Sequence, residues 1–261
     1  HLSLRRQRQM CIRDSIIMSM LGSQSKVIVT GGTRGIGLAI SRLLHEQGYE
    51  VTAIGRETVP KYLPASINYI QADLSRSDDV SLVCGYIEAH PQAILINNLG
   101  IDKNKPFEDI SMNEFQHVLD TNVTSHFRLC KSCIPGMIDN KWGRIVFITS
   151  IWGNTSIRYR QAYSSSKFAL HGLAASLADE YASKNIHVNC VAPGFIDIDK
   201  TTSTDDPCFR GKDRIKLLEE QIPMKRLGQP KEVANLVQWL VSPQCTYITG
   251  QTITCLLYTS D

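Results

Sequence analysis

The sequence lacks the features that would point to a membrane or a nucleic acid. None of its apolar runs is long enough to span a bilayer as a helix. Its net charge is only +3, and residues 1–24, with four arginines against one aspartate, account for the whole excess. The rest of the chain is neutral overall, whereas a nucleic-acid partner requires a basic face on the folded domain. We therefore expect neither a membrane nor a nucleic-acid partner.

The sequence also lacks a set of metal ligands. Cys130 and Cys133 are its only close pair of cysteines, and they could form half of a redox or metal site. No second pair and no cluster of histidines completes a ligand set, so packing of two small side chains one helical turn apart is the favoured interpretation. We expect no metal. A chain of this size needs no disulfides, and its eight cysteines are compatible with a reducing cytoplasm.

The two ends of the chain are unlike the remainder. Residues 1–24 are rich in arginine, which is typical of a transit peptide or of foreign sequence, and the residues after Thr254 are unusual in a similar way. We favour foreign sequence. The sequence thus predicts a disordered or foreign extension over 1–24, one domain over 25–254, and an atypical, possibly foreign tail over 255–261.

Between the ends, short apolar runs alternate with segments of helical periodicity. Strands are predicted over 26–30, 50–54, 67–71, 93–97, 144–148, 186–191 and 248–254, and helices over 35–48, 80–90, 111–133, 161–181 and 231–240. Apolar strands alternating with helices indicate a parallel sheet covered on both faces. The expected fold is α/β, a single doubly wound domain of the Rossmann type with seven parallel strands. Ligands bind such sheets beyond the carboxyl ends of the strands.

A serine, a tyrosine and a lysine follow the fifth predicted strand. Ser150 comes directly after that strand, and Tyr163 and Lys167 lie four residues apart, on one face of the next helix. A nearby ammonium favours the phenolate and lowers the pKa of a tyrosine. Such a tyrosine can exchange a proton with a substrate oxygen near neutral pH, while Ser150 holds that oxygen.

A glycine-rich turn between the first strand and its helix predicts a nucleotide site. Gly31, Gly35 and Gly37 permit a tight turn, close approach of a pyrophosphate, and its binding at the helix N-terminus. An ordinary strand–helix loop is the alternative. The second strand ends in Gly55-Arg56 rather than in a carboxylate that would bind the ribose of NAD. With Arg34 in the turn, two guanidinium groups suit a 2′-phosphate, so NADP(H) is preferred and NAD(H) remains possible, with Glu57 nearby.

Read together, these motifs resemble the short-chain dehydrogenase/reductase family over about residues 25–254. The matching pieces occur in the family's order: Thr30-Gly31-x-x-x-Gly35-x-Gly37, Asp73-Leu74, Asn97-Asn98-Leu99-Gly100, Asn122, Ser150, Tyr163-x-x-x-Lys167 and Pro193-Gly194. The resemblance implies an oxidoreductase that exchanges a hydride with a ketone or secondary alcohol. It also implies a homodimer or homotetramer, for which the apolar residues Val123, Phe127, Leu129, Phe168, Leu170 and Leu173 would supply a seam unless they pack in the core.

The resemblance also implies roles for individual residues. Asn122, Ser150, Tyr163 and Lys167 would be catalytic, with Asn122 anchoring a water that relays protons through Lys167. Lys167 would also bind the nicotinamide ribose, and Asp73 the adenine amino group. The full set of expected cofactor residues is Gly31, Thr33, Arg34, Gly35, Ile36, Gly37, Arg56, Asp73, Leu74, Asn98, Gly100, Tyr163, Lys167, Pro193, Gly194 and Ile196.

Three features bear on the substrate. Residues 222–233 and 247–251 resemble the 3-oxoacyl-[acyl-carrier-protein] reductase branch, although sugar and polyol dehydrogenases carry similar sequences. The long segment 194–223 is either a lid or a surface insertion. Four cations, Lys103, Lys105, Arg158 and Arg160, would form a basic entrance for an acyl-carrier partner unless they are solvated loop charges. A nucleotide-binding protein without catalysis is the alternative of another class.

Overall fold

The computed structural model describes residues 25–198, 216 and 219–255. The predictions for residues 1–24 and for most of the segment 194–223 therefore lie outside the described residues, as does the tail beyond Cys255. None of the helices within the described ranges is both long and apolar enough to cross a membrane.

The fold is organised around one parallel sheet, as the alternating pattern predicted. Its strands in chain order are β1 (Lys26–Thr30), β2 (Glu50–Gly55), β3 (Asn68–Gln71), β4 (Ile94–Asn97), β5 (Gly143–Ile148), β6 (Ile186–Ala192) and β7 (Thr252–Thr254). They lie in the order β3-β2-β1-β4-β5-β6-β7, and every pair is parallel. The order reverses between β1 and β4, which is where a doubly wound sheet opens a crevice for ligands.

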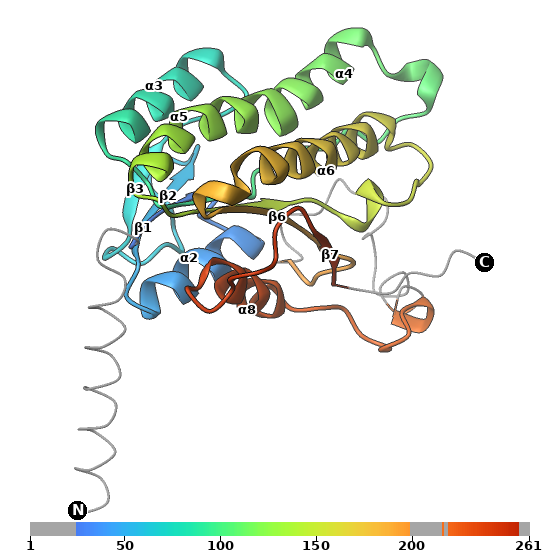
Figure 1. Ribbon diagram of the computed structural model, residues 1–261. Helices are drawn as coiled ribbons and strands as arrows, with labels where there is room; N and C mark the ends of the chain where they lie inside the picture. The colour runs from blue at the N-terminus through green and yellow to red at the C-terminus, as the bar shows by residue number, and fades with distance from the viewer. Residues whose placement is uncertain (1–24, 199–215, 217–218, 256–261) are drawn as a thin grey trace, which may run out of the picture.

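Helices cover both faces of the sheet (Figure 1). The helices α2 (Gly35–Glu46) and α8 (Pro230–Val241) pack together on one face, and the helices on the other are α3 (Ser77–Ala89), α4 (Met112–Leu119), α5 (Ser125–Asp139) and α6 (Gln161–Tyr181). Successive residues of a strand point to opposite faces, so Val27 and Val29 pack with α2 and α8 while Ile28 joins the other core. Both faces are apolar and buried, which explains why the strands read as continuous apolar runs.

The last strand is shorter than predicted, because it begins at Thr252 rather than at Ile248. The chain before it takes a positive φ of +72° at Gly250, which no β-strand residue adopts. Backbone hydrogen bonds from Gly250 to Val188 and from Cys190 to Gln251 still join this segment to β6, and side chains add two more. Asn189 Nδ2 donates to the carbonyl of Ile248, and Thr249 Oγ1 accepts from the backbone N–H of Val188.

The prediction of one helix over 111–133 is wrong in a way that matters for the site. The helical segment is interrupted by a π turn, η3 (Asp120–Thr124), and then continues as α5 to Asp139. A π turn adds one residue to a helix and is frequently found at functional sites. Thr121 Oγ1 and Ser125 Oγ donate to the carbonyls four residues before them, which satisfies acceptors around the bulge.

Candidate functional site

A groove of about 880 Å³ opens at the carboxyl ends of the central strands. Fifteen of the sixteen expected cofactor residues line this groove or the cleft that continues it toward β3, and Ser150 lines the groove as well. Gly37 lies behind the glycine turn and Asn122 behind the groove wall, so these two predicted residues reach no lining surface. The structure thus brings together the glycine turn, the Ser150 segment and the Tyr163 helix.

The glycine turn has a geometry that only glycine permits at two points. Gly31 has a φ of +61°, and a Cβ added to Gly37 would lie 2.1 Å from the carbonyl oxygen of Gly31. Asn98 braces the turn, because its Nδ2 donates to the carbonyls of Thr30 and Gly31 at 2.9 and 3.2 Å. Thr30 Oγ1 in turn accepts from the backbone N–H groups of Asn98 and Leu99. The turn is therefore held open toward the groove at the start of α2, as a pyrophosphate requires.

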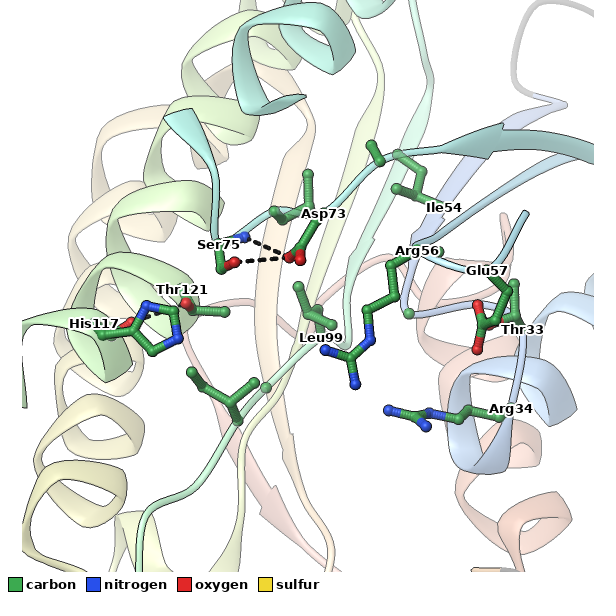
Figure 2. Close-up of a pocket in the computed structure, with 16 residues that line it drawn as sticks. Thr33, Arg34, Ile54, Arg56, Glu57, Asp73, Ser75, Leu99, His117 and Thr121 are labelled. Carbon is green, nitrogen blue, oxygen red and sulfur yellow. Dashed lines mark hydrogen bonds between the residues drawn. The ribbon is translucent and has the colours of Figure 1, made fainter. Parts of the chain in front are cut away.

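Two arginines and one glutamate stand at the end of β2. Figure 2 shows the guanidinium groups of Arg34 and Arg56 extending toward the same side of the cleft. No carboxylate of the described residues forms an ion pair with either of them. The carboxylate of Glu57 is held apart, because it accepts a hydrogen bond of 2.9 Å from Thr33 Oγ1. The cleft therefore presents positive charge that a bound anion can neutralise.

Asp73 lies in the same cleft, on the loop after β3. Its Oδ1 accepts from the backbone N–H and the hydroxyl of Ser75, the latter at 2.8 Å (Figure 2). Burial alone would raise the pKa of Asp73, but these hydrogen bonds and the charges of Arg56 and Arg76 outweigh it and lower the pKa below its usual value. Asp73 is thus an ionised acceptor with a fixed orientation.

Lys167 is a buried cation at the centre of the groove. Its side chain is only 2% exposed, and its Nζ donates to the carbonyl of Ile148 at 2.9 Å and lies 5.4 Å from the centre of the Tyr163 ring. Burial lowers its pKa from 10.5 to about 8, with Cys190 and Asp102 opposing that change. The ammonium form still predominates at neutral pH. Ser150 lies on the facing segment, and its Oγ accepts from the backbone N–H of Trp152, which leaves the hydroxyl proton free for a ligand.

Asn122 sits inside the π turn, fully buried, and its amide is used within the protein. Its Oδ1 accepts from the backbone N–H of Ile101, and its Nδ2 donates to the carbonyl of Ile101 and to Ser166 Oγ, all at 2.8–2.9 Å. Both hydrogens of the Asn122 amide therefore form hydrogen bonds within the protein. The side chain fastens the loop after β4 to α6, close to Lys167.

Two histidines near Lys167 were missed by the sequence reasoning, because neither belongs to a motif. His171 follows Lys167 by one helical turn and its Nε2 lies 3.0 Å from Thr149 Oγ1. His126 follows Asn122 by one turn and is fully buried. Neither of its ring nitrogens makes a hydrogen bond of ordinary geometry within the described residues. Burial, and then the charge of Lys167, lower the pKa of His126 to about 3, so its ring is neutral.

Two of the four cations of the expected basic entrance are neutralised by ion pairs. Arg160 Nη1 forms an ion pair of 2.6 Å with Asp102, and Lys105 Nζ one of 2.7 Å with Glu114. These pairs fasten the loop after β4 to α4 and to the start of α6. Of the four predicted cations only Lys103 and Arg158 form no ion pair with a carboxylate of the described residues.

An apolar wall lies beside Tyr163. It consists of Ile151, Trp152, Phe195, Ile222 and Leu227, with Ile157 and Tyr163 packed against it. The Trp152 and Phe195 rings meet edge to face, with centroids 6.0 Å apart. Ile198 lies over the other side of the groove, close to Gly35.

Cys130 and Cys133 are packing residues, as the favoured interpretation held. Both are buried, and burial raises the pKa of Cys130 to about 12 and that of Cys133 well above its usual value. Burial therefore disfavours the thiolate, which is the form of cysteine that attacks an electrophile or binds a metal. No group of three potential metal ligands occurs in the part of the chain that the structure describes.

Comparison with known proteins assigns the chain to a class of oxidoreductase. Residues 25–207 match the family described as short chain dehydrogenase. The chain belongs to the short-chain dehydrogenase/reductase family, whose members use NAD(P), and it is an NAD(P)-dependent oxidoreductase acting on CH–OH groups.

Several relatives and solved structures are similar over most of the chain. Nodulation protein G of Rhizobium sp. (strain N33) is 39% identical over 235 residues, which cover 87% of this chain and 94% of that protein. The 3-oxoacyl-[acyl-carrier-protein] reductase MabA of Mycobacterium tuberculosis (strain ATCC 25618 / H37Rv) is 34% identical, with coverage of 87% and 89%. A putative NAD(P) dependent gluconate 5-dehydrogenase from Beutenbergia cavernae, solved with bound NADP at low occupancy, superposes with a TM-score of 0.79 at 29% identity, with coverage of 87% and 93%. Thermoplasma acidophilum aldohexose dehydrogenase also gives 0.79, at 30% identity and with coverage of 88% and 91%.

Proposed function

We propose that this protein reduces a ketone, preferably a 3-oxoacyl thioester, to a secondary alcohol with NADPH. The observation that carries the proposal is that the glycine turn, Arg34, Ser150 and the Tyr163–Lys167 pair line one groove, and that Arg56 lines the cleft that continues it. Nucleotide binding alone does not require a buried lysine beside a tyrosine and a serine, whereas proton transfer to a substrate does, so Lys167, Tyr163 and Ser150 favour an enzyme.

The groove fits an NADP(H) molecule at each part of that cofactor. The Gly31–Gly37 turn would hold the pyrophosphate, and Arg34 and Arg56 the 2′-phosphate. Asp73 and Leu74 would meet the adenine, and Asn98, Gly100, Pro193, Gly194 and Ile196 would lie along the nicotinamide half. When bound, the reduced cofactor supplies the hydride.

Tyr163, Lys167 and Ser150 would act on the carbonyl oxygen. Ser150 would donate a hydrogen bond to that oxygen, and Tyr163 would deliver the proton. The Lys167 ammonium would stabilise the phenolate that remains and would bind the nicotinamide ribose. Because both amide hydrogens of Asn122 are spent, a water at Asn122 would bind through its main-chain carbonyl.

The apolar wall favours an acyl substrate over a sugar. Trp152, Phe195 and Leu227 offer no hydrogen bonds from their side chains to a row of hydroxyl groups, apart from the indole N–H, and buried hydroxyls without partners weaken binding. The relatives named 3-oxoacyl-[acyl-carrier-protein] reductase support the acyl substrate. The structures named gluconate and aldohexose dehydrogenase support a sugar alcohol as the alternative.

A screen of NADPH oxidation over 3-oxoacyl thioesters, keto-sugars and aromatic ketones tests the reaction. We expect the highest kcat/KM on a 3-oxoacyl thioester and loss of turnover in Tyr163→Phe, with the affinity for NADPH retained. Turnover retained in Tyr163→Phe would remove this residue as the acid. A preference for keto-sugars would select the alternative.

Replacement of the two arginines tests the cofactor preference. We expect Arg34→Ala and Arg56→Ala to weaken NADPH binding by roughly 10-fold each, the value of one charge-assisted hydrogen bond, and to leave NADH binding unchanged. Glu57→Gln is the matched control for charge, and it should affect NADH more than NADPH. Equal efficiency of the unmodified protein with both cofactors would refute the preference.

The same proposal includes assembly and location. Leu129 and Leu170 are buried in the core, but Phe127 and Phe168 are 50% and 48% exposed on α5 and α6, and these two side chains would form the seam of a homodimer or homotetramer. Solution mass of Phe127→Lys against the unmodified protein tests it. The six described cysteines are free thiols, which suits the cytoplasm, and an acyl-carrier partner would approach Lys103 and Arg158.

A further inference from the structure

His171 connects the helix that carries Tyr163 and Lys167 to the segment that carries Ser150. The three side chains of α6 lie four residues apart, at 163, 167 and 171, and so share one face of that helix. His171 is half-buried at the end of this row, beyond Lys167, and it faces residues 149–153.

The direction of the hydrogen bond between His171 and Thr149 follows from the other contact of the threonine. When Thr149 Oγ1 donates its hydrogen to the carbonyl of Val191, 3.2 Å away, the 3.0 Å contact with His171 Nε2 is made by a proton on Nε2. Burial, and then the charge of Lys167, lower the pKa of His171 against a hydrogen bond with the backbone of Gly153 that raises it, which keeps the ring neutral. We expect the Nε2–H tautomer, in which Thr149 donates to Val191.

The same ring contacts the far end of the serine segment. A Cβ added to Gly153 would lie 2.8 Å from Cε1 and 3.1 Å from Nε2 of His171, so the imidazole lies directly against Gly153. Ser150 lies between the two contacts, and the N–H of Gly153 donates to the Ser150 carbonyl at 2.9 Å. One side chain of α6 thus holds both ends of the short turn that fixes Ser150.

We propose that His171 is a positioning residue that sets the distance between Ser150 and Tyr163 by tying the serine segment to α6. The proposal rests on the proposed reaction, in which both hydroxyls must reach one carbonyl oxygen. A misplacement of about 1 Å in such an arrangement can cost up to 10²-fold in rate.

Substitutions at both ends of the hydrogen bond test the proposal. We expect His171→Leu to lower kcat by roughly 10-fold, with the Kd for NADPH unchanged, because the cofactor contacts are elsewhere. His171→Gln keeps an amide N–H near the position of Nε2 and should restore most of kcat. Adding Thr149→Val to His171→Leu should cost little more, since the bond is already lost. His90→Leu, an exposed histidine on the far end of α3, is the matched control.

Three outcomes would overturn the proposal: full kcat in His171→Leu, equal loss in His171→Gln, or independent effects of the two substitutions. Nitrogen NMR of the His171 ring in the full chain provides a test without substrate. It should report the Nε2–H tautomer, with a shift of that signal in Thr149→Val. If no ketone is reduced, the proposed reaction fails while the NMR result still decides the contact, and an Nδ1–H tautomer would refute it.

Discussion

Two buried cations at opposite ends of the same sheet differ in how their charges are satisfied. Arg144, near the amino end of β5, donates to the carbonyls of Gly143, Asn185 and Cys245, and its guanidinium lies 4.5 Å from the centre of the Trp142 ring. Lys167, near the carboxyl end, donates one hydrogen bond within the described residues, to the carbonyl of Ile148. Each is 2% exposed, and burial lowers the pKa of both, to about 10 and about 8.

The comparison separates a structural cation from a functional one. Arg144 has partners on several sides and does not line the groove or the cleft described above. Its guanidinium group therefore serves to hold three segments of the chain together. Lys167 is left with spare donors beside a groove, and its perturbed pKa brings its titration close to neutral pH. Burial alone does not distinguish the two residues, whereas the number of partners does.

The largest expected effect comes from removing the functional cation. Lys167→Met should lower kcat/KM by roughly 10³-fold, about 4 kcal/mol in the barrier, because both the charge beside Tyr163 and a ribose contact are lost. Steady-state kinetics with NADPH measure this. Lys167→Arg is the control for charge, since it keeps a cation in a less compact form. Activity within 10-fold of the unmodified enzyme in Lys167→Met would remove Lys167 from the chemistry.

The same substitution, Lys167→Met, should stabilise the folded protein although it lowers kcat/KM. A lysine whose folded pKa of about 8 lies below its unfolded pKa near 10.5 costs stability as pH falls from 10.5 to 8, and the full cost, about 3 kcal/mol, remains at pH 7. Loss of the hydrogen bond to Ile148 offsets part of that gain. Lys167→Met should therefore raise the free energy of unfolding at pH 7 by about 1–2 kcal/mol, as urea titration would measure. A destabilised Lys167→Met would contradict the proposed cost of its charge.

Removal of the structural cation, Arg144, should destabilise the fold and leave kcat unchanged. Arg144→Met removes a donor from the carbonyls of Gly143, Asn185 and Cys245, of which that of Asn185 keeps the backbone N–H of Gly143, and we expect the free energy of unfolding to fall by about 3 kcal/mol. The kcat of the folded fraction should stay unchanged, because the site lies at the other end of the sheet. A change in kcat with stability intact would break the comparison.

A smaller effect is expected from His126, the buried ring near Lys167. Its pKa of about 3 lies below the unfolded value of 6.5, so the unfolded chain binds the extra proton and stability falls as pH drops below 6.5. Between pH 7 and pH 5 this histidine alone should cost about 2 kcal/mol. His126→Leu should remove that part of the acid-side loss in urea titrations at the two pH values, and His90→Leu should not. Parallel losses in the unmodified chain and in His126→Leu would show that the ring titrates normally.

The sequence predicted the sheet and the groove because both follow from local patterns. Continuous apolar runs identified all seven strands, and the glycine turn, Ser150, Tyr163 and Lys167 each lie at a strand end or on a helix face that spacing alone defines. The features that were missed depend on contacts between distant residues. The pair Arg160–Asp102 and the contact His171–Thr149 join residues 58 and 22 positions apart, and no spacing in one segment reports them.

The π turn at Asp120–Thr124 has a further consequence for reading this chain. One added residue rotates everything after it by about 100° relative to a continuous α-helix. The apolar positions of α4 and α5 therefore belong to two helices that are out of phase with each other. The amide of Asn122 helps to hold the turn, through its hydrogen bonds with Ile101 and Ser166. Deletion of one residue of the turn other than Asn122 would leave the helical pattern and every motif in the sequence, but it would rotate α5 relative to α4 by about 100° and so change the neighbours that α5 faces.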